Sequence, residues 1–471
     1  MEQFDIAIIG GGSGGLTAAR VAASLGARVL LIDKESLGGD CLHYGCVPSK
    51  SLIHVARIVQ KVKEAEKFGV TAALSQLDMV RVSEYIQGVI RRVAENERVY
   101  IEGVTAKFGK VRFKSADELD LNGEPVRCRK IIIATGSHPA IPDIEGLEKT
   151  GYLTNESVFN LLELPASLVS VGGGPVGVEL GQALSRLGVK VTIIQGPERI
   201  LPREDPDVSE FVTGVLRSEG VEVVTGARVV KASRSGKQKV VTAKKGEALL
   251  SFEADELLVA VGRRPNVEGL DLKAAGISYG AKGIEVNDFL RTSTPHVFAL
   301  GDVIGGYLFT HVAAYQAGIA VRNALVPFKK KVNYRVVPWC IFTEPEVARV
   351  GLTLDEAVKQ HKQARVVTFP WAEIDRAQTE DETMGFIKLV VAGKKDQLVG
   401  VHMVGAQAGE LLGEMTLAMQ NNLTLNDLYN TIHAYPTMST GIQQAAFEGY
   451  LESPTAAQNR KLVSVLNKLR S

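Results

Sequence analysis

The sequence contains little cysteine and carries almost no net charge. Its 471 residues include four cysteines, and 54 basic against 53 acidic side chains leave a net charge of +1. So few cysteines exclude the disulfide scaffold of a small secreted domain. A balanced charge provides no basic field to attract nucleic acid or an anionic membrane, so we expect neither as a partner.

Long hydrophobic runs are absent as well. No apolar run approaches the roughly 18 residues that a membrane-spanning helix needs. The first apolar run follows the acidic residue Glu2 and ends at Gly10, which is typical of a core strand rather than a signal peptide. We therefore expect a cytoplasmic protein, in which two nearby cysteines indicate redox catalysis or metal binding. The length predicts about three domains.

Glycine, by contrast, is abundant, with 47 residues, and it gathers in short turns. One turn follows an apolar strand at 4–9 and precedes an alanine-rich helix at 16–25. Its Gly10, Gly12 and Gly15 have the spacing of a dinucleotide-binding turn, in which glycines allow a tight turn, close approach of a pyrophosphate and close helix–strand packing. The phosphates would lie at the helix N-terminus, where free N–H groups favour negative charge.

The same order returns in the middle of the chain. A strand at 167–171 leads to Gly172, Gly174 and Gly177 at the same spacing, and a helix is predicted over 175–187. Two nucleotide sites in one chain indicate one tightly bound cofactor and one exchangeable cofactor. A bound flavin with a nicotinamide donor is the economical pairing.

The residue that closes the second strand of each unit distinguishes the two sites. Asp33 fills this position in the first unit, where an acidic side chain holds ribose hydroxyls. Gln195 fills it in the second unit, and its neutral amide can bind a ribose without repelling a 2′-phosphate. Because Arg199 and Arg203 follow closely, the sequence favours NADPH over NADH, although both arginines are equally compatible with solvated surface positions.

The segment 38–50 carries the most chemical information. Its Cys41 and Cys46 are five residues apart, which in a continuous helix is too far for a disulfide, whose Cα atoms lie within about 7 Å. The pair can close only if Cys41 precedes the helix, and Gly45 and Pro48 favour a helix that starts between them. Cys46 would then lie at the helix N-terminus, where the dipole lowers the pKa of a thiol.

A cation and the lack of other ligands support a redox role for this pair. Lys50 lies one helical turn past Cys46 and shares its face, so its charge would favour a thiolate. A metal site would need about four ligands with local spacing. Only His43 is close in sequence, so we expect no metal site. Cys128 and Cys340 stand alone and are interpreted as structural.

These motifs resemble those of the pyridine nucleotide–disulfide oxidoreductases, a family that includes lipoamide dehydrogenase, glutathione reductase and mercuric reductase. The likeness runs from Gly10 to about Gly441. Its matching stretches are Gly-Gly-Asp-Cys-Leu-His-Tyr-Gly-Cys-Val-Pro-Ser-Lys at 38–50, Ala-Thr-Gly-Ser at 134–137, Val-Gly-Arg-Arg-Pro-Asn at 261–266, Leu-Gly-Asp-Val at 300–303 and Phe-Thr-Glu-Pro-Glu at 342–346.

The resemblance implies an α/β fold with two Rossmann-like dinucleotide-binding domains and a C-terminal α+β dimerisation domain. The FAD-binding domain would comprise residues 1–148 and 268–337, the NAD(P)-binding domain residues 149–267 and the dimerisation domain residues 338–471. The family works as a homodimer, because the C-terminal domain of one subunit completes the active site of the other.

The resemblance also implies roles for individual residues. Cys46 would be the thiol against the flavin, Cys41 the interchange thiol that attacks the substrate, and Lys50 would pair with Glu179. The residues implied for FAD are Gly10, Gly12, Ser13, Gly14, Gly15, Asp33, Gly39, Lys50, Ala106, Thr135, Gly136, Asp302, Leu308, Phe309, Thr310 and His311. Those implied for the nicotinamide nucleotide are Gly172, Gly174, Gly177, Gln195 and Gly262.

The C-terminal pattern departs from the disulfide reductases of this family. They carry a histidine directly before Pro-Thr and a glutamate soon after, and the histidine acts as acid and base for the thiols. Here Tyr435 and Thr440 stand at those positions, and His433 lies two residues too early. A tyrosine at the position of Tyr435 resembles the pattern of mercuric reductase. That enzyme also has two C-terminal cysteines, however, and this chain has no cysteine after Cys340. His433 is interpreted as structural, with a shifted catalytic role as the alternative.

The sequence therefore predicts an NAD(P)H-dependent flavin oxidoreductase of the mercuric-reductase-like branch, acting on a thiol, disulfide or metal-ion acceptor. Lipoamide dehydrogenase is the second interpretation, and the missing histidine argues against it. Two other interpretations remain: the chain is an electron-transfer subunit of a larger complex, or it is a flavin-only reductase of quinones or oxygen.

Overall fold

The computed structural model describes residues 4–99 and 101–470. By their internal contacts these residues form two compact units. Unit 1 comprises residues up to 198 together with 219–332, and unit 2 comprises 199–218 together with the chain from 333. The segment 199–218 thus packs with the C-terminal part of the chain, although by sequence it lies inside the predicted NAD(P)-binding domain.

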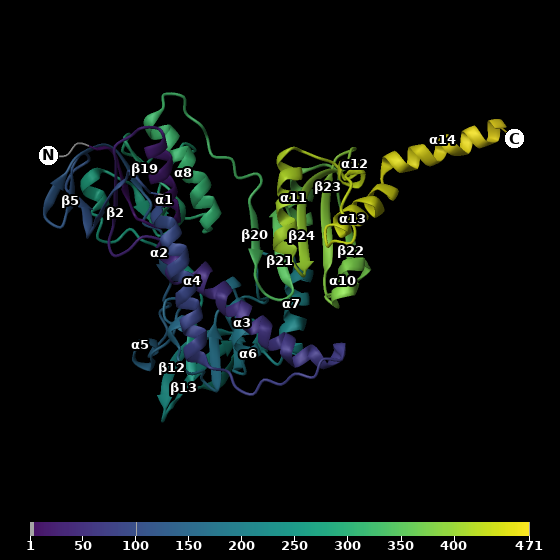
Figure 1. Cartoon of the computed structure of the whole chain (residues 1–471), viewed down its shortest axis with the longest axis horizontal. Helices are drawn as coiled ribbons and strands as arrows, with labels where there is room; N and C mark the ends of the chain where they lie inside the picture. The colour runs from purple at the N-terminus through teal and green to yellow at the C-terminus, as the bar shows by residue number, and fades with distance from the viewer. Residues whose placement is uncertain (1–3, 100, 471) are drawn as a thin grey trace. The chain divides into compact units, whose positions relative to one another are not determined.

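Unit 1 contains a five-stranded parallel sheet in the order β19-β7-β1-β2-β3, of which β19 and β2 are labelled in Figure 1. Both faces of a parallel sheet are covered, which explains why its strands are continuous apolar runs. Helices α1 (Ser13–Ser24) and α8 (Thr310–Leu325) pack against each other and share one apolar core with this sheet. The strands are β1 (Phe4–Ile9), β2 (Val29–Asp33), β3 (Thr105–Phe108), β7 (Cys128–Ile133) and β19 (Val297–Ala299).

A second parallel sheet of unit 1 repeats this arrangement in the order β11-β10-β9-β15. Helix α6 (Pro175–Arg186) follows β9 as α1 follows β1. The predicted strand–turn–helix–strand order is therefore confirmed at both glycine turns of unit 1, with helix ends within a few residues of the expected ones. The strands are β9 (Ser167–Val171), β10 (Lys190–Ile194), β11 (Glu222–Val224) and β15 (Glu256–Val259).

The two glycine turns have the same geometry because the same two positions exclude a side chain. A Cβ atom at Gly10 or Gly172, both with positive φ, would collide with a backbone carbonyl of the neighbouring strand. A Cβ atom at Gly15 would collide with the Gly10 carbonyl oxygen, and one at Gly177 would meet the corresponding oxygen of Gly172. These glycines are therefore required by the backbone itself.

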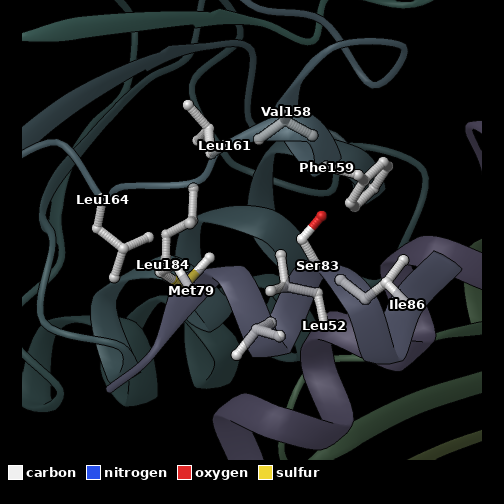
Figure 2. Close-up of a pocket in the computed structure, with 10 residues that line it drawn as sticks. Leu52, Met79, Ser83, Ile86, Val158, Phe159, Leu161, Leu164 and Leu184 are labelled. Atoms are coloured by element: carbon white, nitrogen blue, oxygen red, sulfur yellow. The ribbon is translucent and has the colours of Figure 1, made fainter. Parts of the chain in front are cut away.

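Smaller elements complete unit 1. Helices α3 (Cys46–Glu64) and α4 (Met79–Val99) pack together, and with α6 and residues 158–164 they line a small apolar pocket, shown in Figure 2. The remaining strands form small antiparallel sheets: β4 (Val111–Phe113), β5 (Leu119–Leu121), β6 (Glu124–Val126); β8 (Ser137–Pro139) with β16 (Arg263–Pro265); β12 (Arg228–Ser235), β13 (Gln238–Lys245), β14 (Ala248–Ala254); and β17 (Tyr279–Gly280) with β18 (Gly283–Ile284).

Unit 2 is built on an antiparallel sheet in the order β20-β21-β24-β23-β22. The expected strands and the expected helix near 409–420 are confirmed by β23, β24 and α11. The strands are β20 (Pro338–Ile341), β21 (Glu346–Gly351), β22 (Ala364–Pro370), β23 (Phe386–Ala392) and β24 (Gln397–Gly405). The helices are α7 (Pro206–Ser218), α9 (Leu354–Gln360), α10 (Asp375–Glu380), α11 (Ala408–Gln420), α12 (Leu425–Asn430), α13 (Thr440–Leu451) and α14 (Pro454–Arg470).

An ionic cluster around the buried Lys388 side chain joins the segment 199–218 to this sheet. The Lys388 ammonium lies 2.6 Å from Asp205 and 2.8 Å from Asp207 at the start of α7. Burial lowers the pKa of Lys388, but hydrogen bonds to both carboxylates outweigh it and raise the pKa overall. Because unpairing a buried charge is costly, this cluster explains why the segment belongs to unit 2.

The glycine geometry predicts that two neighbouring substitutions differ strongly in their effect on stability. Gly177→Ala places a methyl group on a carbonyl oxygen, and we expect it to lower the free energy of unfolding by about 3 kcal/mol or more. Gly174→Ala places the methyl group where no atom lies within 4 Å, and we expect a loss below about 1 kcal/mol. Thermal unfolding of both variants measures this difference, and equal losses would contradict it.

Candidate active site

The structure places Cys41 and Cys46 next to each other on two consecutive helices. Cys41 lies in the short helix α2 (Gly39–His43), and Cys46 is the first residue of α3. Both are free thiols within hydrogen-bonding contact of each other. The helix that carries Cys46 therefore begins where the sequence predicted, and Cys41 precedes it.

The two thiols differ in acidity. The hydrogen bond from the Cys41 thiol, together with the charge of Lys50 and the Thr310 hydroxyl, lowers the pKa of Cys46 to about 6, although burial opposes this shift. The same contact with Cys46, together with burial, raises the pKa of Cys41. At neutral pH the pair thus consists of a thiolate at Cys46 and a protonated thiol at Cys41.

Lys50 acts on this thiolate through its charge. Its ammonium group lies 2.8 Å from a carboxylate oxygen of Glu179, and this is the pair that the family resemblance implied. Glu179 is buried in α6, while Lys50 lies on α3 one turn after Cys46. The ion pair joins the helix of the redox pair to the helix of the second glycine turn, and Lys50 and Glu179 shift the pKa of Cys46 in opposite directions.

Thr310, the first residue of α8, lies beside the redox pair. Its hydroxyl is 3.7 Å from the Cys46 sulfur atom, although 264 residues separate them in sequence. Of the other residues expected to cover the flavin, Phe309 and His311 stack their rings 5.3 Å apart. Thr310 therefore reaches the dithiol from a distant part of the chain, and no local sequence pattern signals this contact with Cys46.

The first glycine turn is packed against the redox segment. The Cβ position of Gly39 would lie 2.7 Å from the Cα atom of Gly12. Asp33 at the end of β2 accepts a hydrogen bond of 2.6 Å from the backbone N–H of Gly11. Gly12 itself caps α1 and leaves space around its Cβ position, apart from a contact with Gly39 at 3.8 Å. The turn thus has the open backbone and acidic closing residue that fit the pyrophosphate and ribose of a dinucleotide.

The other residues expected at the FAD site lie around this turn. Ser13, Gly14 and Gly15 form the first turn of α1, and Ala106 lies in β3, whose neighbour is β2. Thr135 donates a hydrogen bond to the backbone of Asn266. Gly136, which follows it, has positive φ.

A network around Arg263 was not predicted from the sequence. The Arg263 guanidinium lies 3.1 Å from Asp40, the residue before Cys41, and its Nε atom donates to the Ser137 hydroxyl at 2.7 Å. Ser137 in turn donates to Asp302 at 2.5 Å. Burial raises the pKa of Asp302, although Ser137 and Arg263 counteract it. Asp302 is thereby tied through Arg263 to the segment that carries Cys41.

The second glycine turn matches the first at the position of its closing residue. Gln195 accepts a hydrogen bond of 2.7 Å from the backbone N–H of Gly173, as Asp33 does from Gly11. Gly174 caps α6 and Gly262 has positive φ, and no atom lies within 4 Å of either Cβ position. The open backbone fits a second nucleotide. Arg199 and Arg203, both exposed, belong to unit 2.

His433 is held by two acceptors within unit 2. Its Nδ1 atom lies 2.9 Å from the carbonyl oxygen of Thr431, and its Nε2 atom lies 2.9 Å from a carboxylate oxygen of Glu414 on α11. The His433 side chain is only 5% exposed. Both ring nitrogens are thus engaged, which favours the structural interpretation. Sequence reasoning missed Glu414, which lies nineteen residues earlier on another element.

Tyr435 is 73% exposed and donates a hydrogen bond of 2.9 Å to Asp375 on α10. This hydrogen bond and the charge of Asp375 raise the pKa of Tyr435. The phenol therefore stays protonated at neutral pH, so that it can donate a hydrogen bond but cannot serve as a base. Across residues 4–99 and 101–470, no group of three or more His, Cys, Asp or Glu side chains is placed to hold a metal ion, and no helix is long and apolar enough to cross a membrane.

Comparison with known proteins shows the family to which the chain belongs. The profile of pyridine nucleotide-disulphide oxidoreductases matches residues 4–317, and that of their dimerisation domain matches residues 337–446. Mercuric reductase of Staphylococcus aureus is 34% identical over 448 residues, which cover 94% of this chain and 82% of that protein. Dihydrolipoyl dehydrogenase of Thermus scotoductus is 36% identical over 480 residues, which cover 99% of this chain and 100% of that protein.

Two solved structures share the whole fold. The HOCl-induced flavoprotein disulfide reductase RclA from Escherichia coli has a TM-score of 0.84 at 29% identity, covering 93% of this chain and 98% of that chain. LpdA from Mycobacterium tuberculosis has a TM-score of 0.87 at 27% identity, covering 95% of this chain and 99% of that chain. The predicted fold class is thereby confirmed, and the dimerisation domain supports a homodimer. With its two glycine turns and its dithiol, this chain belongs to the pyridine nucleotide–disulfide oxidoreductases, a family of flavoproteins that use FAD and NAD(P)H.

Proposed function

We propose that this enzyme carries electrons from NADPH through FAD to the Cys41–Cys46 pair, and from there to a thiol, disulfide or metal-ion acceptor. The observation that carries the proposal is the asymmetry of the two thiols. Cys46, with its pKa of about 6, is suited to face the flavin as a thiolate. Cys41, with its raised pKa, keeps its proton until it attacks the acceptor.

The chain's own residues can be given roles on this basis. Bound FAD would supply two-electron transfer between the nicotinamide and the disulfide. Gly10, Gly12, Asp33 and Asp302 would hold it. Reduction breaks the Cys41–Cys46 disulfide and leaves a thiolate at Cys46 and a thiol at Cys41, so that two electrons and one proton are taken up at neutral pH.

Lys50 holds the negative charge of the Cys46 thiolate, and Thr310 donates a hydrogen bond to it. Transfer to the acceptor reverses the balance. Cys41 attacks and releases its proton to solvent, two electrons pass to the acceptor (to one disulfide or mercuric ion, or to two cupric ions), and the disulfide bond forms again.

A mercuric-reductase-like acceptor is favoured by the C-terminal residues. Tyr435 replaces the histidine of the disulfide reductases, and its raised pKa makes it a hydrogen-bond donor rather than a base. His433, the other candidate base, is held by Glu414. Among the relatives is a mercuric reductase, and among the structures is a Cu(II) complex of RclA. Thiolates are the ligands that soft metal ions prefer, so a thiophilic metal ion is our preferred acceptor.

Dihydrolipoamide is the second candidate substrate. The chain is 34–36% identical to dihydrolipoyl dehydrogenases, which favours dihydrolipoamide as much as the similarity to mercuric reductase favours mercuric ion. The absence of a free base at Tyr435 argues against it. For the donor, we propose NADPH, because Gln195 carries no charge to repel a 2′-phosphate.

An anaerobic titration of the yellow protein with NADPH, and separately with NADH, tests the electron path. We expect about one equivalent to produce a long-wavelength charge-transfer band and two new thiols, with NADPH reacting faster. Cys46→Ser should remove the band and keep FAD bound, whereas Cys41→Ser should keep a thiolate next to the flavin. Bleaching of the flavin without new thiols would exclude the dithiol from the path, and a surviving band in Cys46→Ser would overturn the assignment of the two cysteines.

The charge-transfer band should also depend on pH, since it reports the Cys46 thiolate. In the two-electron-reduced enzyme we expect it to grow as the pH rises through about 6. Lys50→Met removes a cation that stabilises the thiolate and should move the midpoint up by about one pH unit or more. Glu179→Gln removes an anion that opposes it and should move the midpoint down. Shifts in the same direction for both variants would refute the electrostatic explanation.

Turnover on a panel of acceptors distinguishes the candidate functions. We expect NADPH oxidation with mercuric or cupric ion, slow turnover of lipoamide, and at least a hundredfold loss on the metal ions in Cys41→Ser. Quinone or oxygen reduction, which needs only the flavin, should survive that substitution. Lipoamide turnover at about 10 per second or more would make lipoamide dehydrogenase the better assignment. Negligible turnover on all free acceptors, with a co-purifying protein, would favour an electron-transfer subunit.

A further inference from the structure

The C-terminal helix α14 lies beyond the part of the chain that matches the dimerisation domain. That match ends at residue 446, and α14 begins at Pro454 after the end of α13. Figure 1 shows α14 continuing from α13 and extending away from the sheet of its own unit. The helix has 17 residues, and the catalytic chemistry proposed above assigns it no role.

One face of α14 is apolar and exposed. Leu462, Leu466 and Leu469 follow one another at helical spacing, with Val463 and Val465 on either side of them. Their exposed fractions range from 43% at Leu466 to 78% at Leu469. At 3.6 residues per turn, these five residues cover roughly 160° of the helix circumference. We call them the α14 apolar face.

The rest of the helix is polar and basic. Arg460, Lys461 and Lys468 are exposed, and they lie with Ser464 on the side opposite the α14 apolar face. Arg460 also donates a hydrogen bond to the carbonyl oxygen of Leu451. With Arg470, residues 454–471 contain four basic and no acidic side chains.

This concentration of charge is hidden by the balance of the whole chain. The rest of the sequence has 50 basic against 53 acidic side chains, so it is slightly acidic, whereas the last 18 residues carry four positive charges. The expectation of no membrane partner rested on the net charge of +1 and on the lack of a spanning segment. Neither argument excludes a helix that lies on a membrane surface, where a local basic face is what matters.

We propose that α14 binds the surface of an anionic phospholipid bilayer, with the α14 apolar face in the acyl boundary and Arg460, Lys461 and Lys468 at the headgroups. A broad apolar face opposite a basic polar face is the pattern of an interfacial helix. Each basic residue near such a surface adds electrostatic attraction. The enzyme would thereby act next to a membrane.

Two other arrangements of α14, pairing with a second copy and spanning a bilayer, fit less well. Pairing of α14 with the same helix of a second copy usually uses a narrow seam flanked by opposite charges, and α14 has a broad face and no acidic residue. An apolar segment of 17 residues with this many cations is also too polar to span a bilayer. The occupant that complements both the apolar face and the charge is an anionic lipid surface.

Co-sedimentation of the full-length flavoprotein with vesicles tests the proposal. We expect binding to vesicles of phosphatidylcholine with phosphatidylglycerol, and about tenfold or more weaker binding to phosphatidylcholine alone. Binding should also weaken at about 0.5 M salt, because screening then limits the electrostatic attraction to a few ångströms. The variant R460Q/K461Q/K468Q should lose binding to the anionic vesicles, and so should L462Q/L466Q.

A matched control removes the same number of cations elsewhere on unit 2. Lys362, Lys394 and Lys395 are exposed, and K362Q/K394Q/K395Q should bind anionic vesicles like the parent. Thermal unfolding and NADPH-driven thiol formation should be unchanged in all three variants, because none of these residues belongs to the dithiol or the glycine turns. A failed titration with intact vesicle binding would therefore overturn the proposed function and leave this inference standing.

Light scattering of a variant that ends at Ser453 distinguishes the remaining outcomes. If truncation leaves the oligomeric mass unchanged and abolishes vesicle binding, the proposal holds. If truncation dissociates the oligomer and the parent does not bind vesicles, the α14 apolar face belongs to a subunit interface and the proposal is wrong. Equal binding of the control and the R460Q/K461Q/K468Q variant would likewise overturn it, since the charge of α14 would then have no part.

Discussion

The contact between the thiols of Cys41 and Cys46 is the interaction on which the rest of the site depends. A shared hydrogen bond places negative charge on one sulfur and the proton on the other, so two chemically identical side chains acquire opposite roles. The contact requires that the chain turn between α2 and α3, because five residues of continuous helix would separate the two sulfur atoms. Gly45, which caps α3, supplies that turn.

The surrounding residues hold the pair in place from three parts of unit 1. Lys50 is fixed by Glu179 on α6, Thr310 approaches from α8, and Asp40 is fixed by Arg263. Gly39 touches Gly12 of the first glycine turn at the same time. A shift of the nucleotide-binding turn would therefore shift the segment that carries Cys41. This coupling gives a physical reason why the glycine turn and the dithiol occur together in one sequence.

The sequence predicted what depends on local patterns and missed what depends on distant contacts. The strands, the glycine turns and the start of α3 at Cys46 follow from apolar runs and glycine spacing, and the structure agrees with them. The Lys50–Glu179 pair was reached only through the family resemblance. Arg263 with Asp40, Thr310 with Cys46 and Glu414 with His433 could not be predicted, because each joins elements whose proximity only the folded chain creates.

The C-terminal residues show why net charge and motif spacing alone do not predict what α14 can bind. Averaged over the sequence, the charge excludes an electrostatic partner, yet four cations within 18 residues create a local field that decays over about 10 Å at moderate salt. A bilayer responds to the charge within that distance, not to the sum over the protein. The distribution of charge along α14, and its phase relative to the apolar residues, is therefore the quantity that decides what the helix can bind.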